Sequence, residues 1–286
     1  MTKQKAKEEI VILGAGLAGL STAYHLKKGY SLYEKESEAG GTARSIHKDG
    51  YIFDFDGHLL HFRKEYTFLL VRELLEGNLA PHKRSSWIYS KGSYTRYPFQ
   101  ANFYGLPRDV VKECLLGYIE AKDISGGKGK EKLNGNFENW IKNIFGSGIA
   151  KYFMIPYNKK FWTVDPSQLG CDWLDGFVPV PTLEDTVTGA ISSNTKSFGY
   201  NSRFWYPVKG GISELTEGFL RRVNNVHLDK RAVTIDQYRR EIVFEDGVIK
   251  RFKKLITTIP LPELYKVLVN LPPQIKEAFR SLRWTS

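Results

Sequence analysis

A short apolar run opens the chain, and apolar residues at helical spacing follow it. Residues Ile10–Leu13 read IVIL and lead directly into glycines, a pattern that predicts a buried parallel strand. The stretch LAGLSTAYHL over residues 17–26 has the periodicity of a helix. A second strand is expected over residues 30–34, so the order strand, helix, strand predicts a βαβ unit.

Alternating patterns beyond this unit predict strands and a hairpin. Residues 50–62, GYIFDFDGHLLHF, predict a strand and turn that lead to an exposed segment. Residues 85–99, SSWIYSKGSYTRYPF, predict a hairpin that turns at Lys91 and Gly92.

A helical region is expected in the middle of the chain. Asn136 is a suitable N-cap and Gly146 a suitable stop for one helix. A second helix around residues 149–154 is expected to run into Pro156. The apolar face of the first helix comprises Phe137, Trp140, Ile141, Ile144 and Phe145.

The chain then returns to strands. Residues 226–247 alternate as a β-meander does, with a turn near residues 238–240, and residues 253–264 predict a buried strand followed by Pro260 and Pro262. We therefore predict an α/β fold: a Rossmann-type domain with a parallel sheet and a β-meander, plus an inserted mixed α+β domain.

The expected domain boundaries follow from this order. Residues 1–65 and 206–286 are predicted to form the discontinuous dinucleotide-binding domain, and residues 66–205 the inserted substrate domain. We see no internal repeat.

Composition indicates a globular protein of the cytoplasm. The chain has 286 residues, 42% of them hydrophobic, so it can bury a substantial core. No apolar run approaches the roughly 20 residues that cross a bilayer, and the charged N-terminus MTKQKAKEEI is unlike a signal peptide. Cys114 and Cys171 lack disulfide-framework or metal-site spacing, and no metal site is predicted.

The formal net charge of +11 favours an anionic partner. The basic residues are scattered, and the densest cluster, residues 125–136, reads as a solvated loop that fails the Walker A pattern. These features favour an anionic small molecule over nucleic acid. They leave the oligomeric state open.

Three glycines at the first strand-to-helix turn predict a dinucleotide site. Gly14, Gly16 and Gly19 form GxGxxG: the first permits the tight turn, the second lets the backbone approach a pyrophosphate, and the third lets helix and strand pack closely. Glu34 follows at the distance of a ribose-binding carboxylate, which disfavours NADP because a 2′-phosphate would be repelled.

A second glycine pair narrows the dinucleotide to FAD. The segment EAGGTARS places Gly40, Gly41 and Arg44 just after the acidic residue, and it resembles flavoproteins of the amine oxidase and protoporphyrinogen oxidase type. The resemblance implies FAD as the cofactor, with this segment along its diphosphate and ribityl chain. Flavoproteins of this type normally finish with a further Gly-Asp segment and helix, so we expect the sequence to be truncated after Ser286.

Three further stretches resemble UDP-galactopyranose mutases. They are RYPFQANFYGLP over residues 96–107, NFENWIKNIFGSGIAKYFMIPYNKKFWTVDPSQLGCDWL over residues 136–174 and FWYPVKGGISEL over residues 204–215. Gly57 and His58 match the Gly-His that lies beside the flavin in that family. The resemblance implies a UDP-sugar substrate, with flavin N5 acting as a covalent catalyst.

The resemblance also implies roles for single residues. His58 would present its backbone near flavin N5, Val233 would hold the adenine edge, and Thr258 and Pro260 would lie near the flavin phosphates. Each pocket residue also has a purely structural interpretation, such as core packing for Trp162 or capping for Asn158. The residues implied to line the uridine and sugar pocket are Tyr97, Phe99, Gln100, Asn158, Trp162 and Asn201.

One position departs from the mutase pattern. Where mutases carry an arginine that clamps the diphosphate, this chain has an apolar residue near Phe177, and Arg203 is the candidate to replace it. Two alternatives therefore remain: an FAD-dependent oxidoreductase of the amine oxidase or protoporphyrinogen oxidase type, and a catalytically incomplete fragment or scaffold.

Overall fold

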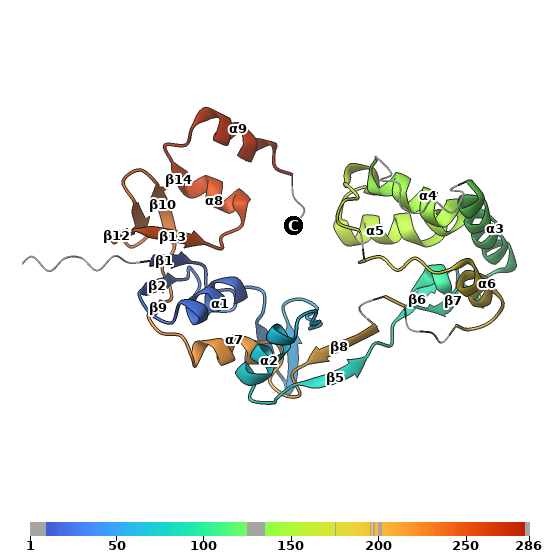
Figure 1. Cartoon of the computed structure of the whole chain (residues 1–286), viewed down its shortest axis with the longest axis horizontal. Helices are drawn as coiled ribbons and strands as arrows, with labels where there is room; N and C mark the ends of the chain where they lie inside the picture. Colours follow the sequence, from blue (N-terminus) through green and yellow to red (C-terminus); the bar gives the residue numbers. More distant parts are fainter. Residues whose placement is uncertain are drawn as a thin grey trace, which may run out of the picture. The chain divides into compact units, whose positions relative to one another are not determined.

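The computed structural model divides the chain into two compact units (Figure 1). Unit 1 comprises residues 1–82 and 205–283, and unit 2 comprises residues 83–204. The first boundary thus lies later than the expected residue 66. The structure describes residues 10–124, 135–174, 176–194, 196, 198–199 and 202–283, so the basic loop predicted over residues 125–136 lies mostly outside them.

A parallel four-stranded sheet forms the centre of unit 1, as the βαβ pattern predicts. Its strand order is β13-β1-β2-β9, and helix α1 makes the crossover between β1 and β2. The elements are β1 (Ile10–Leu13), α1 (Leu17–Leu26), β2 (Tyr30–Tyr33), β9 (Val226–His227) and β13 (Lys254–Thr257).

Alternate residues of β1 and β2 enter two different cores. Ile12 and Leu32 pack with α1 and with α7 (Ser213–Leu220) on one face of the sheet. Val11, Leu13 and Tyr33 pack on the other face, against the second sheet and helix α8 (Leu261–Val267). Both faces are therefore buried, which explains why β1 reads as an unbroken apolar run.

The second sheet contains the predicted meander. Its order is β12-β11-β10-β14, and the turn between β10 and β11 falls at residues 237–240, as expected. The meander starts later than predicted, because Val226 and His227 pair with β2 of the parallel sheet instead. The remaining elements here are β10 (Ala232–Asp236), β11 (Glu241–Phe244), β12 (Ile249–Arg251), β14 (Leu268–Val269), α8 (Leu261–Val267) and α9 (Pro273–Ser281).

A small hairpin and a helix complete unit 1. Strands β3 (Ser45–Lys48) and β4 (Tyr51–Asp54) pair antiparallel, and the predicted strand over residues 50–62 is thus confirmed. Helix α2 (Glu65–Leu74) buries Leu74 in the same core as Phe219 of α7. This burial explains why the helix belongs to unit 1, although it was expected in the inserted domain.

Unit 2 begins with the predicted hairpin. Strands β6 (Trp87–Ser90) and β7 (Ser93–Arg96) pair in register around Lys91 and Gly92, which have φ values of 52° and 81°. Positive φ at both central residues is the signature of a type I′ turn. Strands β5 (Ala80–Lys83) and β8 (Arg203–Tyr206) pair with each other where the chain passes between the units.

Helices build the rest of unit 2 around an aromatic core. The side chain of Asn136 accepts a hydrogen bond from the Asn139 amide at 3.0 Å, as expected of the N-cap of α4. The predicted stop at Gly146 is confirmed, because the backbone there is not helical, with a φ of 74° and a ψ of 176°, and a second helical segment follows directly within α4. Pro156 does not end a helix, because it lies in the first turn of α5. The elements are α3 (Arg108–Ile124), α4 (Phe137–Ile149), a π-helical turn (Ala150–Met154), α5 (Ile155–Trp162) and α6 (Leu183–Ile191).

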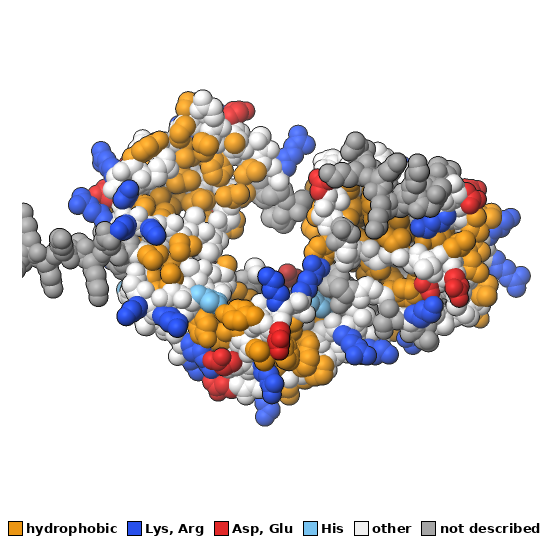
Figure 2. Space-filling view, viewed as in Figure 1, with side chains coloured by type: hydrophobic (Ala, Val, Ile, Leu, Met, Phe, Trp, Pro, Cys, Tyr) orange, Lys and Arg blue, Asp and Glu red, His pale blue; other side chains and the backbone are white. Residues whose placement is uncertain are grey.

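Charged side chains are dispersed over the described surface. Figure 2 shows Lys and Arg side chains at separate points on the visible face of each unit, with hydrophobic and neutral surface between them. Among the described residues, no helix is long and apolar enough to cross a membrane.

Candidate functional site

A cavity of about 740 Å³ opens in unit 1 where β1 and β13 end. Its size is within the range of small-molecule and cofactor sites. Eight of the residues predicted to contact the flavin dinucleotide line it: Gly14, Gly16, Glu34, Gly41, Arg44, Val233, Thr258 and Pro260.

Two glycines shape the turn beneath the cavity. Gly14 has a φ of +96°, and a Cβ there would lie 2.3 Å from Thr258 Oγ1. A Cβ on Gly19 would lie 1.8 Å from the carbonyl oxygen of Gly14. Only glycine therefore allows helix α1 to start so close to β1, which is the packing that the fingerprint requires.

Gly16 differs from these two glycines, because the space beside its Cα is open to the cavity and is not filled by protein atoms. It is the N-cap of α1, and it pairs as an isolated parallel bridge with Gly40, whose amide donates to the Ala15 carbonyl at 2.8 Å. Within 4 Å, a Cβ on Gly16 would meet only the Gly41 Cα, at 4.0 Å. Bare backbone at a helix N-terminus forms a cradle that suits a diphosphate.

Glu34 is held firmly at the end of β2. The residue is buried, its Oε2 accepts from the Ala15 amide at 2.7 Å, and its Oε1 accepts from the Glu36 amide at 3.1 Å. An ionised carboxylate has about four lone-pair sites, so both oxygens retain capacity for ribose hydroxyls. The cavity, the glycine cradle and this carboxylate together fit a dinucleotide.

Arg44 is tethered beside the cradle. Its Nε donates to the Gly41 carbonyl at 2.8 Å, and its guanidinium lies 4.7 Å from the centre of the Phe55 ring. Phe55 lines the cavity too, although the sequence did not single it out. Other lining residues that were missed include Thr42, Lys230, Arg231, Ile259 and Glu263, and their only signal is closeness in sequence to predicted residues.

Gly57 and His58 are not among the residues that line this cavity. The His58 Nδ1 atom is buried without a hydrogen-bond partner in the described structure, and it lies 3.9 Å from Asp54 Oδ2. Gly57 has no atom within 4 Å of a Cβ position.

Asp54 is the centre of a polar network that sequence reasoning missed. It accepts hydrogen bonds from Ser45 Oγ at 2.7 Å, Tyr206 Oη at 2.5 Å and the Ile212 amide at 3.2 Å. Burial acts to raise the pKa of Asp54, but these hydrogen bonds outweigh it and lower the pKa below its ordinary value. Burial and then the bond to Asp54 raise the pKa of Tyr206.

The expected substrate residues of unit 2 do not all face a pocket. Phe99 was predicted as a pocket wall, but it is fully buried in the core and stacks on Phe153 with ring centres 4.9 Å apart. Gln100 is also buried; its Nε2 donates to the Pro179 carbonyl at 2.7 Å, and its Oε1 has no partner in the described structure. Asn158 is buried and donates to the Met154 carbonyl at 2.7 Å, one helical turn earlier.

The other positions differ in their surroundings. Trp162 is half-buried against the core, with its ring centre 5.4 Å from that of Trp173. Asn201 lies outside the described residues. Phe177 and Arg203 are both exposed.

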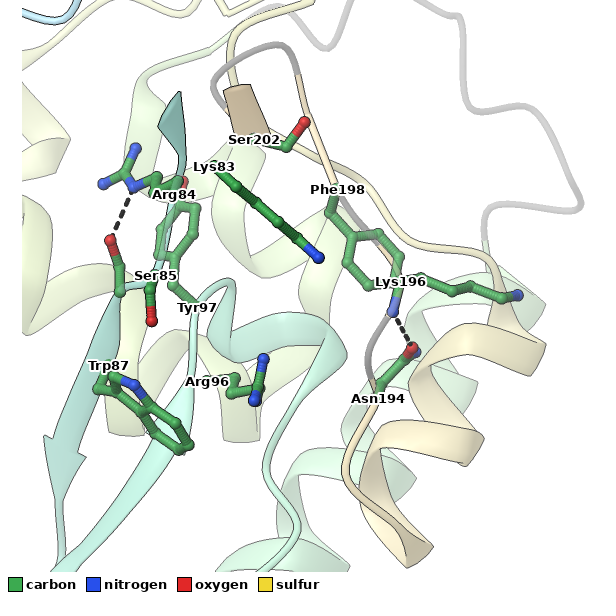
Figure 3. Close-up of a pocket in the computed structure, with 11 residues that line it drawn as sticks. Lys83, Arg84, Ser85, Trp87, Arg96, Tyr97, Asn194, Lys196, Phe198 and Ser202 are labelled. Atoms are coloured by element: carbon green, nitrogen blue, oxygen red, sulfur yellow. Dashed lines mark hydrogen bonds between the residues drawn. The ribbon is translucent and has the colours of Figure 1, made fainter. Parts of the chain in front are cut away.

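Tyr97 lines a second, smaller pocket, which lies within unit 2 (Figure 3). Its volume is about 60 Å³, several times the roughly 10–15 Å³ that one water needs. We call it the basic pocket; its lining comprises Lys83, Arg84, Ser85, Ser86, Trp87, Arg96, Tyr97, Asn194, Lys196, Phe198 and Ser202.

The fold and the cradle define the class of the protein: it is built on a dinucleotide-binding domain. Residues 17–286 match the model of the flavin containing amine oxidoreductase family, and the chain belongs to that family. Its cofactor is FAD.

Two similar proteins are porphyrinogen oxidases. Mitochondrial protoporphyrinogen oxidase of Nicotiana tabacum is 32% identical over 268 residues, which cover 82% of this chain and 51% of that protein. Coproporphyrinogen III oxidase of Staphylococcus aureus is 29% identical over 304 residues, covering 94% and 61%. The chain thus spans about half to three fifths of the length of these relatives.

Solved structures share the architecture. Reduced UDP-galactopyranose mutase superposes with a TM-score of 0.84 at 26% identity, covering 95% of this chain and 60% of that chain. Putrescine oxidase bound to putrescine superposes with a TM-score of 0.62 at 15% identity, which is a likeness of fold.

Proposed function

We propose that the chain is part of an FAD-dependent enzyme that acts on a nucleotide sugar in the manner of UDP-galactopyranose mutase. The observation that carries this proposal is the likeness to that enzyme over 95% of the chain, at a TM-score of 0.84 and 26% identity. Residues 96–107 and 136–174 of unit 2, which resemble stretches of UDP-galactopyranose mutases, support it.

In this proposal FAD binds in the unit 1 cavity. The backbone around Gly16 and Gly41 binds the diphosphate at the N-terminus of α1, where the helix dipole and free amides favour an anion. Glu34 accepts hydrogen bonds from ribose hydroxyls, and the backbone of Val233 holds the adenine edge. Thr258 and Pro260 line the phosphate end.

The protein's remaining work is to orient the sugar and offset the charge of the leaving nucleotide. When bound, reduced FAD supplies the nucleophile of the reaction. The backbone of His58 lies near the reacting ring in this proposal, and Tyr97 and Trp162 offer flat faces to the nucleotide.

An oxidoreductase is the second candidate. The 32% identity to protoporphyrinogen oxidase favours it, as does Phe177, since an apolar side chain cannot neutralise a diphosphate. In this alternative, FAD held in the unit 1 cavity would supply the electron acceptor for oxidation of a substrate carbon.

Ligand binding and turnover assays distinguish the mutase from the oxidoreductase. Purified protein, extended to the full gene product if the gene continues, is first examined for flavin absorbance and then titrated with UDP and UDP-galactose in its reduced form. Saturable UDP binding with redox-neutral isomerisation supports the mutase. Stoichiometric consumption of an electron acceptor without a UDP response supports the oxidoreductase, and full-length protein without flavin contradicts both.

A further inference from the structure

We propose that the basic pocket of unit 2 binds a phosphate-bearing anion through Lys83 and Arg96. The identification of this anion as the diphosphate of the substrate rests on the proposed function. The binding of phosphate itself does not, because it follows from the lining of the pocket.

The lining contains only cationic and neutral side chains. Four of its residues are Lys or Arg, whereas none of the lining residues is Asp or Glu. Figure 3 shows the side chain of Lys83 directed into the middle of the pocket, with the guanidinium of Arg96 below it. Such a concentration of positive charge in a concave surface raises the local concentration of anions.

The four cations are not equivalent. Lys196 Nζ lies 2.6 Å from Asp185 Oδ1, and Figure 3 shows its side chain directed away from the pocket. Lys83, Arg84 and Arg96 form no ion pair with any residue that the structure describes. Arg84 instead donates to Ser86, and Figure 3 shows its guanidinium directed away from Lys83. The charges of Lys83 and Arg96 are therefore available to a ligand in the pocket.

Aromatic rings hold both arginines in place. The Arg96 guanidinium lies 5.0 Å from the centre of the Trp87 ring, and that of Arg84 lies 4.6 Å from the centre of the Tyr97 ring. Arg84 Nε also donates to Ser86 Oγ at 2.8 Å. A guanidinium is planar and presents its N–H donors as a fork that suits the oxygens of a phosphate. The contact with an aromatic ring restricts the movement of each guanidinium.

The size and polarity of the pocket favour a phosphoryl group over a larger anion. The open volume of about 60 Å³ holds a few waters or one such group, but not a whole nucleotide. Ser85 and Ser202 add hydroxyl donors to the lining. A nucleotide would thus place only a phosphate here.

This assignment supplies the charge that the mutase pattern lacks. Phe177 stands near the position of the clamp arginine, so the counter-charge for a diphosphate must come from elsewhere in the chain. Lys83 and Arg96 provide it within unit 2 itself.

Calorimetric titration with inorganic pyrophosphate tests the proposal, at low salt and with FAD in excess so that the unit 1 cavity is filled. Lys83→Gln and Arg96→Gln are each expected to weaken binding about tenfold or more, because each removes a charge-assisted hydrogen bond. Lys112→Gln, an equally exposed charge on α3 outside the pocket, is the matched control and should leave the affinity unchanged. Arg96→Lys should recover part of the affinity.

The same variants titrated with UDP identify the source of the phosphate. A parallel loss of UDP affinity supports the pocket as the diphosphate site of the substrate. Pyrophosphate binding without UDP binding supports the phosphate site but contradicts the nucleotide-sugar function. Absence of pyrophosphate binding, or equal affinity in all variants, overturns the pocket assignment whether or not UDP binds elsewhere.

Discussion

Gly16 differs from the other fingerprint glycines in what surrounds it. Gly14 and Gly19 are required by neighbouring protein atoms, whereas a side chain at Gly16 would project toward the cavity. The same residue type therefore serves the fold at two positions and the ligand at the third.

We predict that Gly16→Val abolishes FAD retention while the protein stays folded. The added side chain takes the space that the diphosphate needs, and its nearest neighbour at the Cβ is 4.0 Å away. Flavin absorbance after gel filtration and far-ultraviolet circular dichroism measure the two effects. Gly170→Val is the matched control, since no atom lies within 4 Å of its Cβ position and it does not line the cavity. Equal flavin retention in both variants would contradict the site.

Asp54 links stability to pH. Its pKa is lowered in the folded state, so its stabilising contribution is fully present above the ordinary value of 3.8 and is lost as the pH falls through the folded-state pKa. We predict that Asp54→Asn lowers the free energy of unfolding by about 1–3 kcal/mol at neutral pH, because hydrogen bonds to a charged acceptor are weakened.

Urea unfolding at several pH values measures this effect. The difference between Asp54→Asn and the unchanged protein should shrink below pH 3.8, where the Asp54 carboxyl becomes neutral. The exposed Asp56 accepts a single hydrogen bond, from the adjacent Gly57 amide, so Asp56→Asn should change stability by less than about 0.5 kcal/mol. A difference for Asp54→Asn that does not vary with pH would refute the network's role.

At the scale of elements, the contact between α3 and α4 depends on glycine. Gly146 has a φ of +74°, and a Cβ there would lie 1.9 Å from the carbonyl oxygen of Gly117 in α3. Gly148 lies similarly close to Glu113, with its Cβ position 2.4 Å from the carbonyl oxygen. The kink in α4 thus lets two helix backbones touch.

Gly146→Ala is expected to destabilise the chain by about 3–5 kcal/mol, because backbone strain and overpacking add. Gly105→Ala is the matched control: it has a φ of +89° but no atom within 4 Å of the Cβ position. Strain alone should cost about 1–2 kcal/mol there. Denaturant unfolding compares the two variants, and equal losses would show that the contact with α3 is unimportant.

The hairpin, the cap and the stop at Gly146 were predictable at this scale, whereas Pro156 did not end a helix as expected. The turn at Lys91 and Gly92 and the cap at Asn136 are local, so their chemistry can be read from a few residues. Gly146 was expected to end a helix, and its backbone is indeed not helical, with a φ of +74°. The local signal did not reveal that a second helical segment follows at once, or that Gly146 and Gly148 lie against the backbone of α3.

For the whole molecule, the cofactor cavity lies within one unit. Every residue that lines it belongs to unit 1, although the lining comes from both chain segments of that unit. In the proposed function, FAD bound in this cavity would connect residues 13–55 with residues 230–267, and its binding free energy would add to the stability of the folded state.

Hydrogen exchange can test this division. FAD is expected to slow amide exchange in β1, β2, β10 and β13 of unit 1, and to leave α3 and α4 of unit 2 unchanged. Mass spectrometry of peptides with and without FAD measures both. Equal protection in the two units would contradict a cavity confined to unit 1.

The residues predicted to bind the dinucleotide could be named from the sequence where their spacing along the chain is short. Gly14, Gly16 and Glu34 have fixed spacing around one strand-to-helix turn, so the sequence alone places them together. Val233 and Thr258 were named only through resemblance, and the fold brings them to the same cavity across more than 200 residues of chain.

The residues of the substrate pocket were harder to predict from the sequence, because the burial of a side chain depends on the tertiary structure. Phe99 and Tyr97 are two residues apart, yet Phe99 lies in the core and Tyr97 lines the basic pocket. No pattern of types in that segment distinguishes the two, since both are aromatic and either suits a core or a pocket.

The sequence by itself determined the βαβ unit, the glycine cradle, the carboxylate at the end of β2 and the family resemblance. These features depend on residues close together in the chain, where spacing fixes geometry. Only the tertiary structure decided that Asp54, Tyr206 and Ser45 share one network and that Lys83 and Arg96 line one pocket. Such groupings arise from packing between distant segments, which one-dimensional periodicity does not record.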